Sequence, residues 1–156
     1  MIIGVPKEIK IREYRVGLAP ASVRELVERG HSVLVETQAG TGIGMSDEDY
    51  RQAGAEVVLA ASDVFARSEM IVKVKEPQLS ECQLLRPGQI LFTYLHLAPD
   101  PEQAKALMAS GATCIAYETV TSASGGLPLL APMSEVAGRM AIQAGAYFLE
   151  KPHGGL

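Results

Sequence analysis

The sequence has few cysteines, no cluster of basic residues and no long apolar run, and each absence excludes a class of protein. Its two cysteines, Cys82 and Cys114, lack C-x-x-C spacing, so we expect free thiols in a reducing compartment rather than a disulfide or a metal site. Acidic residues outnumber basic ones by 18 to 14, which argues against nucleic acid or an anionic membrane as a partner. No apolar stretch approaches the roughly 18 residues of a membrane span, and residues 1–5 are too short for the apolar region of a signal peptide. A cytoplasmic protein is therefore expected.

Short apolar runs rich in valine, isoleucine and leucine predict the fold. Continuous runs of this kind indicate strands that are covered on both faces. They lie at residues 2–5, 32–37, 56–59, 70–75, 89–96 and 113–117. Helical patterns with proline or an N-cap residue at the start and glycine just after the end separate several of them, at residues 20–29, 46–53 and 101–110. This alternation predicts an α/β domain with a doubly wound, mostly parallel sheet and flanking helices, Rossmann-like in form.

The last part of the chain has a different pattern. A Ser124-Gly125-Gly126 turn between residues 117–121 and 127–130 predicts a hairpin at the end of the sheet. Ser134 is expected to cap a final helix that runs to about Lys151, with apolar residues at helical spacing. We therefore expect one domain over residues 1–132, followed over 133–156 by a hinge and a linker helix that leads into another domain.

Three ionisable residues are predicted to lie at one edge of the sheet. Lys75 and His96 are each the last residue of an apolar run, and Arg15 lies in the connection after the first strand. Open α/β sheets bind ligands beyond the carboxyl ends of their strands, so these side chains could converge there. A guanidinium binds a carboxylate through two hydrogen bonds, an ammonium donates to a carbonyl oxygen, and a histidine can transfer a proton. Taken singly, each is more typical of an ordinary loop or strand-end residue, and it is their shared position that indicates a site.

Three further features allow both a structural and a functional interpretation. The glycines of Gly40-Thr41-Gly42-Ile43-Gly44 have G-x-G-x-G spacing rather than the G-x-G-x-x-G of dinucleotide sites, and acidic residues follow them, so turn glycines are expected. Met133 and Ser134 begin the last helix, where they could belong to a cap or contact a ligand. Glu118 could orient a neighbouring cation or be a solvated strand end.

Four separated motifs resemble a known family. They are Met1-Ile2-Ile3-Gly4-Val5-Pro6-Lys7-Glu8 with Glu13-Tyr14-Arg15-Val16, then Val72-Lys73-Val74-Lys75-Glu76-Pro77, Tyr94-Leu95-His96-Leu97-Ala98, and the segment from Leu129 to Met140. In this order, and over all 156 residues, the chain resembles the amino-terminal part of bacterial alanine dehydrogenases. The related transhydrogenase α-subunit shares the fold and the first motif but lacks counterparts of the last two.

The resemblance implies an enzyme, its cofactor and its site. It implies NAD-dependent oxidative deamination of L-alanine to pyruvate and ammonium, in a cytoplasmic homo-oligomer that is usually a hexamer, without a metal ion. Arg15 and Lys75 would hold the substrate carboxylate and carbonyl, and His96 would assist proton transfer. Met133 and Ser134 would approach the nicotinamide from the hinge side. Residues 1–132 would be the substrate domain, and the hinge and linker helix over 133–156 would lead towards a nucleotide-binding domain absent from this sequence.

Family chains are more than twice as long, and their G-x-G-x-x-G turn follows the last residue of this sequence. We therefore expect no activity from these residues alone. The alternative is a stand-alone module that binds pyruvate or another 2-oxo acid, or packs on a partner chain, without catalysis. A coding sequence that continues past Leu156 into a strand and a G-x-G-x-x-G turn would favour the enzyme.

Overall fold

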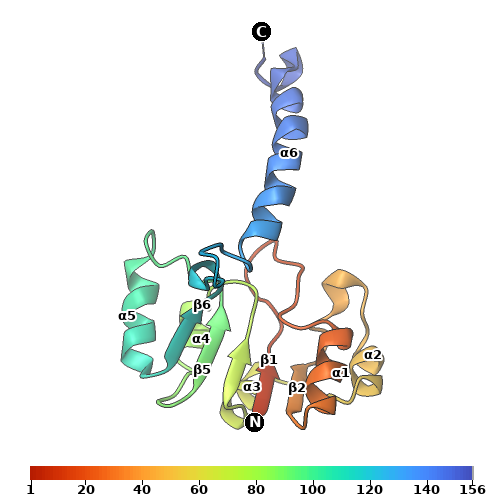
Figure 1. Cartoon of the computed structure of the whole chain (residues 1–156), viewed down its shortest axis with the longest axis vertical. Helices are drawn as coiled ribbons and strands as arrows, with labels where there is room; N and C mark the ends of the chain where they lie inside the picture. The colour runs from red at the N-terminus through yellow and green to blue at the C-terminus, as the bar shows by residue number, and fades with distance from the viewer. Residues whose placement is uncertain (156) are drawn as a thin grey trace. The chain divides into compact units, whose positions relative to one another are not determined.

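A six-stranded parallel sheet forms the centre of the first of two compact units. The computed structural model describes residues 1–155, and the chain divides into Met1–Ala116 and a unit that begins at Tyr117. The strand order is β3-β2-β1-β4-β5-β6, and every neighbouring pair is parallel (Figure 1). The strands are β1 (Ile2–Val5), β2 (Ser32–Glu36), β3 (Glu56–Val58), β4 (Met70–Val72), β5 (Ile90–Thr93) and β6 (Thr113–Ala116). The predicted α/β fold is confirmed.

Helices cover both faces of this sheet, which explains why its strands are continuous apolar runs. One buried cluster includes Val33, Val35 and Val5 and packs against α1 (Pro20–Glu28) and α2 (Asp47–Gln52). The other includes Ile71 and Leu91 and packs against α3 (Ala61–Arg67), α4 (Leu79–Cys82) and α5 (Pro101–Ser110). Because helices lie on both faces, neighbouring residues of one strand can enter different cores, as Val57 and Val58 of β3 do. The sequence patterns indicated α1, α2 and α5 but not the short helices α3 and α4.

Helix ends follow their local sequence. Pro20 and Pro101 occupy first-turn positions of α1 and α5, where the missing N–H costs no hydrogen bond. Asp100 caps α5 by accepting the Gln103 N–H at 3.0 Å, and Gly111 ends that helix with a φ of +68°.

The predicted hairpin over residues 117–130 is wrong. Residues Tyr117–Thr119 form a 3₁₀ helix, and the glycine turn closes on itself because Ser122 exchanges hydrogen bonds with Gly126. The carbonyl of Leu127 then accepts the N–H groups of Leu130 and Ala131, which turns the chain into a helix instead of a return strand.

The expectation that Ser134 caps the last helix is also wrong. The helix α6 (Ala131–Leu149) begins three residues earlier, with Leu130 at the N-cap position and proline in its first turn. Ser134 therefore lies inside the helix, where its hydroxyl donates to the Leu130 carbonyl at 3.4 Å. A short 3₁₀ helix, Lys151–His153, follows. No helix within residues 1–155 is both long and apolar enough to cross a membrane.

The strands that precede Lys75 and His96 are shorter than predicted. β4 ends at Val72 and β5 at Thr93, three residues before each ionisable side chain. Beyond β4 the main chain is bound by a carboxylate, because the Val74 N–H donates to Glu8 Oε1 at 2.6 Å. The apolar pattern continues past the strand because the segment stays buried.

Candidate functional site

The order of the strands reverses between β1 and β4. The connection after β1 leads to β2 on one side, and the connection after β4 leads to β5 on the other. In open α/β sheets such a switch point leaves a crevice beyond the carboxyl ends of the strands, where ligands bind. Arg15 lies in the first of these connections and Lys75 in the second, while His96 follows β5 next to them. The topology therefore places all three residues at the same edge of the first unit.

Glu13 fixes the orientation of Arg15. Its Oε1 accepts Arg15 Nε at 2.8 Å and the Arg15 backbone N–H at 2.9 Å, and its Oε2 accepts Nη2 at 2.6 Å. The hydrogen bonds from Arg15 hold the pKa of Glu13 below its ordinary value, with smaller contributions from the charges of Arg15 and Lys75. The charge of Lys75 thus also favours the ionised form of Glu13. A planar guanidinium held in this way is suited to binding a carboxylate.

We expect the Glu13–Arg15 pair to stabilise the fold above the pH at which Glu13 titrates in the unfolded chain. Because the folded pKa is lowered, this contribution is lost only as the pH falls below the ordinary glutamate value of about 4.3 and through the folded pKa. Carbonyl ¹³C NMR of Glu13 against pH measures the pKa directly. Arg15→Met should return it towards the ordinary value, whereas an unchanged pKa would show that the pair does not form.

Lys75 is bound at its backbone and its side chain. Its N–H approaches Glu8 Oε1 at 3.4 Å, and its carbonyl accepts the Thr93 hydroxyl at 2.8 Å. Its ammonium lies 3.7 Å from Glu76 Oε2, and the other oxygen of Glu76 accepts Lys10 Nζ. The ammonium is thus partly neutralised while its side chain keeps 22% of its surface exposed.

His96 has an unusual backbone conformation. Its φ of +47° lies in the left-handed region, which a residue with a Cβ occupies at a cost. The carbonyl of Leu95 accepts Gln103 Nε2 at 3.0 Å, and the imidazole stacks on Tyr94 with 5.8 Å between ring centroids. Tyr94 also contributes to a raised pKa of Arg15, after the larger effects of the hydrogen bond and charge of Glu13. Tyr94 therefore contacts His96 and acts electrostatically on Arg15.

The glycine-rich segment packs on the protein rather than opening to a phosphate. A Cβ at Gly42 would lie 2.2 Å from the Tyr14 carbonyl oxygen, so the loop that carries Arg15 rests on this glycine. The next helix, α2, has six residues, and the Asp47 carboxylate already accepts the Thr37 hydroxyl and the Gln38 N–H. This segment does not fit a dinucleotide pyrophosphate, in agreement with its interpretation as turn glycines.

Replacing Gly42 with alanine should move the loop that carries Arg15. The added methyl meets main-chain atoms of Tyr14, which cannot rotate away as a flexible side chain would. We expect weaker binding of a carboxylate ligand by about 10- to 100-fold, because displacements of about 1 Å are costly at such sites. Isothermal titration with pyruvate measures the loss. Gly145→Ala, at a helix glycine with open space around it and no positive φ, is the control that should keep the affinity of the unsubstituted protein.

Met133 and Ser134 lie in the first turn of α6, and Glu118 lies in the 3₁₀ helix Tyr117–Thr119. All three belong to the second unit. Their roles remain predictions.

A buried ion cluster that the sequence patterns do not predict lies next to Lys75. The side chain of Lys73 is fully buried, and its ammonium lies 3.1 Å from Glu8 Oε2 and 2.7 Å from Glu81 Oε1. A sequence signal did exist, because a lysine inside a run that is buried on both faces requires buried partners. Glu8 is far from Lys73 in the sequence, and Glu81 lies beyond a proline, so no local pattern identifies either carboxylate as a partner of Lys73.

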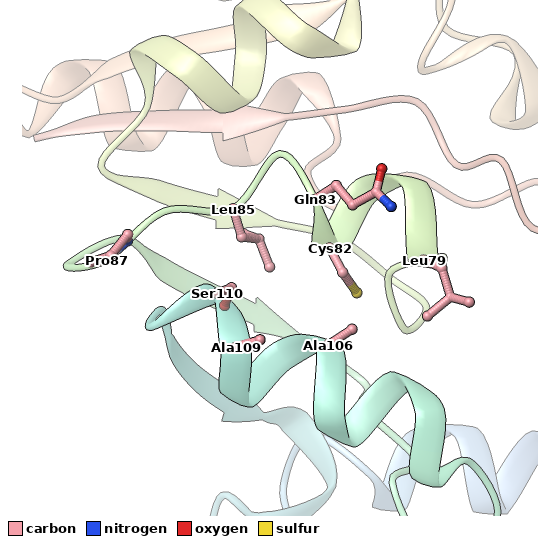
Figure 2. A pocket seen from close by; sticks show the side chains of 8 residues that line it. All are labelled: Leu79, Cys82, Gln83, Leu85, Pro87, Ala106, Ala109 and Ser110. Carbon is pink, nitrogen blue, oxygen red and sulfur yellow. The ribbon is translucent and has the colours of Figure 1, made fainter.

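A separate cavity of about 490 Å³ lies between α4 and α5. Figure 2 shows the eight side chains that line it, among them Cys82, Leu85 and Ala106. None of these eight is charged, so the cavity is not suited to an anion. Burial raises the pKa of the Cys82 thiol to about 11, with a smaller effect from Glu81.

We expect Cys82 to react slowly with thiol reagents in the native protein. With a pKa of about 11, roughly one thiol in a thousand is ionised at pH 8, and the thiolate is the nucleophile. Mass spectrometry after iodoacetamide treatment at pH 8 should find Cys82 unlabelled in the native protein and labelled in urea. Rapid native labelling would contradict the burial.

Sequence and structure comparisons give a consistent set of relatives. Residues 4–137 match the family described as alanine dehydrogenase/PNT, N-terminal domain. The chain is 59% identical to the alanine dehydrogenases of Halomonas elongata and Bacillus subtilis over 99% of its length. A solved L-alanine dehydrogenase superposes with a TM-score of 0.90 at 58% identity, and the transhydrogenase of Sinorhizobium meliloti with 0.71 at 31% over 76% of the chain. The chain spans 42% and 40% of the two curated relatives.

Proposed function

The chain belongs to the family of alanine dehydrogenase and transhydrogenase N-terminal domains, and from this we propose that it forms the substrate domain of an NAD-dependent alanine dehydrogenase. The reaction would be the reversible oxidative deamination of L-alanine to pyruvate and ammonium. The observation that carries the proposal is the position of Arg15 and Lys75 at the switch point of the sheet, in a chain this similar to alanine dehydrogenases. The substrate domain is proposed to comprise residues 1–132, with a hinge and linker helix over 133–156.

Each site residue has a proposed role that follows from its chemistry. Arg15, held in plane by Glu13, binds the carboxylate of pyruvate. Lys75 donates to the carbonyl oxygen and stabilises negative charge there. His96 moves a proton when water and ammonia exchange at the adjacent carbon.

NAD is proposed as the cofactor, which accepts or supplies the hydride. The glycine segment of the first unit does not fit its pyrophosphate, so we propose that it binds mainly outside residues 1–155. Met133 and Ser134 are the residues of this chain that we propose to approach the nicotinamide. The whole protein is proposed to act in the cytoplasm as a homo-oligomer, most simply the hexamer that the family implies.

The test is NADH oxidation, followed by absorbance, with pyruvate and ammonium and the full-length protein that carries this sequence. We expect turnover that is proportional to protein concentration and strongly reduced in His96→Asn, because asparagine tolerates the left-handed backbone and removes only the imidazole. Turnover that is unaffected by this substitution would remove His96 from the site. Pyruvate binding without any turnover would instead favour the non-catalytic module.

A further inference from the structure

The carboxylate of Glu8 joins the buried ion cluster to the main chain that carries Lys75. One of its oxygens, Oε2, lies 3.1 Å from Lys73 Nζ. The other, Oε1, accepts the Val74 N–H at 2.6 Å and approaches the Lys75 N–H at 3.4 Å. The Glu8 side chain has only 2% of its surface exposed, so these bonds are shielded from water. Hydrogen bonds to a charged acceptor in such surroundings hold their geometry firmly.

These contacts add to the main-chain pairing beyond β4, where the Lys73 N–H donates to the Phe92 carbonyl at 3.1 Å and the Tyr94 N–H donates to the Val74 carbonyl at 3.2 Å. β4 ends at Val72; Glu8 then accepts the N–H groups of Val74 and Lys75, and the Thr93 hydroxyl donates to the Lys75 carbonyl. Main-chain bonds therefore hold residues 73 and 74, while two side chains, one from the loop after β1 and one from the end of β5, hold the Lys75 backbone itself. Substituting either Glu8 or Thr93 would therefore shift the backbone from which the Lys75 side chain extends.

Glu81 provides a natural comparison, because it shares Lys73 with Glu8 but has a different second partner. Its Oε1 accepts Lys73 Nζ at 2.7 Å, and its Oε2 accepts the Gln78 N–H at 2.8 Å at the start of α4. Both carboxylates are buried and each forms an ion pair with the same ammonium. Removing either one leaves Lys73 with one carboxylate, so the two losses are alike in charge.

We propose that Glu8 is a positioning residue for Lys75, acting through the main chain of residues 74 and 75 rather than through the substrate. This rests on the proposed function, in which Lys75 donates to the carbonyl oxygen of a 2-oxo acid. Placing that ammonium requires accuracy, because a misplacement of about 1 Å can cost about 100-fold in rate. The Glu8 carboxylate can supply this accuracy, because it neutralises Lys73 and also accepts the N–H groups of Val74 and Lys75.

The experiment compares Glu8→Ala with Glu81→Ala in the full-length protein that carries this sequence. We expect Glu8→Ala to lower kcat/KM for pyruvate by about 10- to 100-fold with little change in KM for NADH, and Glu81→Ala to lower it by less than about threefold. Hydrogen exchange, read by mass spectrometry on peptides that contain residues 74 and 75, should become about tenfold faster in Glu8→Ala only. Melting temperatures of both variants separate these effects from a general loss of stability.

Equal losses of activity in the two variants, in step with their melting temperatures, would overturn the proposal, as would unchanged exchange at residues 74 and 75. If Glu8→Ala does not fold, Glu8→Asp keeps the charge on Lys73 but is too short to reach the N–H groups as well, and the same comparison applies. If the unsubstituted protein shows no pyruvate-dependent turnover, the proposed function fails, and hydrogen exchange still decides whether Glu8 holds this segment.

Discussion

Replacing Lys73 with alanine is expected to lower the free energy of unfolding by about 3 to 5 kcal/mol. The substitution leaves the Glu8 and Glu81 carboxylates without their common cation, in a site where both are almost fully buried. Neither can regain water without moving β4, since the cluster lies against the end of that strand. Urea unfolding followed by circular dichroism measures the change.

Arg67→Ala is the control for this loss. Arg67 also forms two short hydrogen bonds to a carboxylate, Glu56, but both partners are largely exposed and remain hydrated when the pair is broken. We expect little change in the urea midpoint. If Arg67→Ala and Lys73→Ala were equally costly, burial would not be the reason for the importance of Lys73.

Lys75→Ala is expected to lower kcat/KM for pyruvate by about 30- to 1000-fold, or about 2 to 4 kcal/mol of transition-state stabilisation. The ammonium is held beside Glu76 and reaches the edge of the sheet at the switch point, so its loss removes a positive charge that is already in place before the substrate binds. Steady-state kinetics of the full-length protein with pyruvate, ammonium and NADH measure the effect. Stability should change little, because the side chain is partly exposed.

Lys10→Ala is the matched control, because Lys10 is the other cation that binds Glu76 and is more exposed. Its loss should leave kcat/KM close to that of the unsubstituted protein. A pyruvate rate that is unchanged in Lys75→Ala would remove Lys75 from the site. An equal loss in both variants would assign the effect to Glu76 instead.

The end of the chain shows where local patterns mislead. Glycine and serine at residues 124–126 favour a turn, and a turn is present, but a hairpin also needs a partner strand with free N–H groups. Pro128 has none, and the Leu127 carbonyl is used to start α6. Serine is a good N-cap residue, and for this reason the sequence predicts the cap of α6 at Ser134. The helix instead begins at Ala131, with proline in its first turn, a position that suits proline.

The sequence by itself determined the class of fold, the six strands and the edge of the sheet at which Arg15, Lys75 and His96 lie. These follow from the period of the apolar residues and from the parallel direction of the strands, which are local or topological properties. Only the tertiary structure decided that Glu8 and Glu81 flank Lys73, that Glu13 fixes Arg15, and that Gly42 supports the loop with Arg15. Contacts such as Glu8–Lys73 join residues far apart in the chain, and their hydrogen bonds depend on distances of a few tenths of an ångström, which no local pattern specifies.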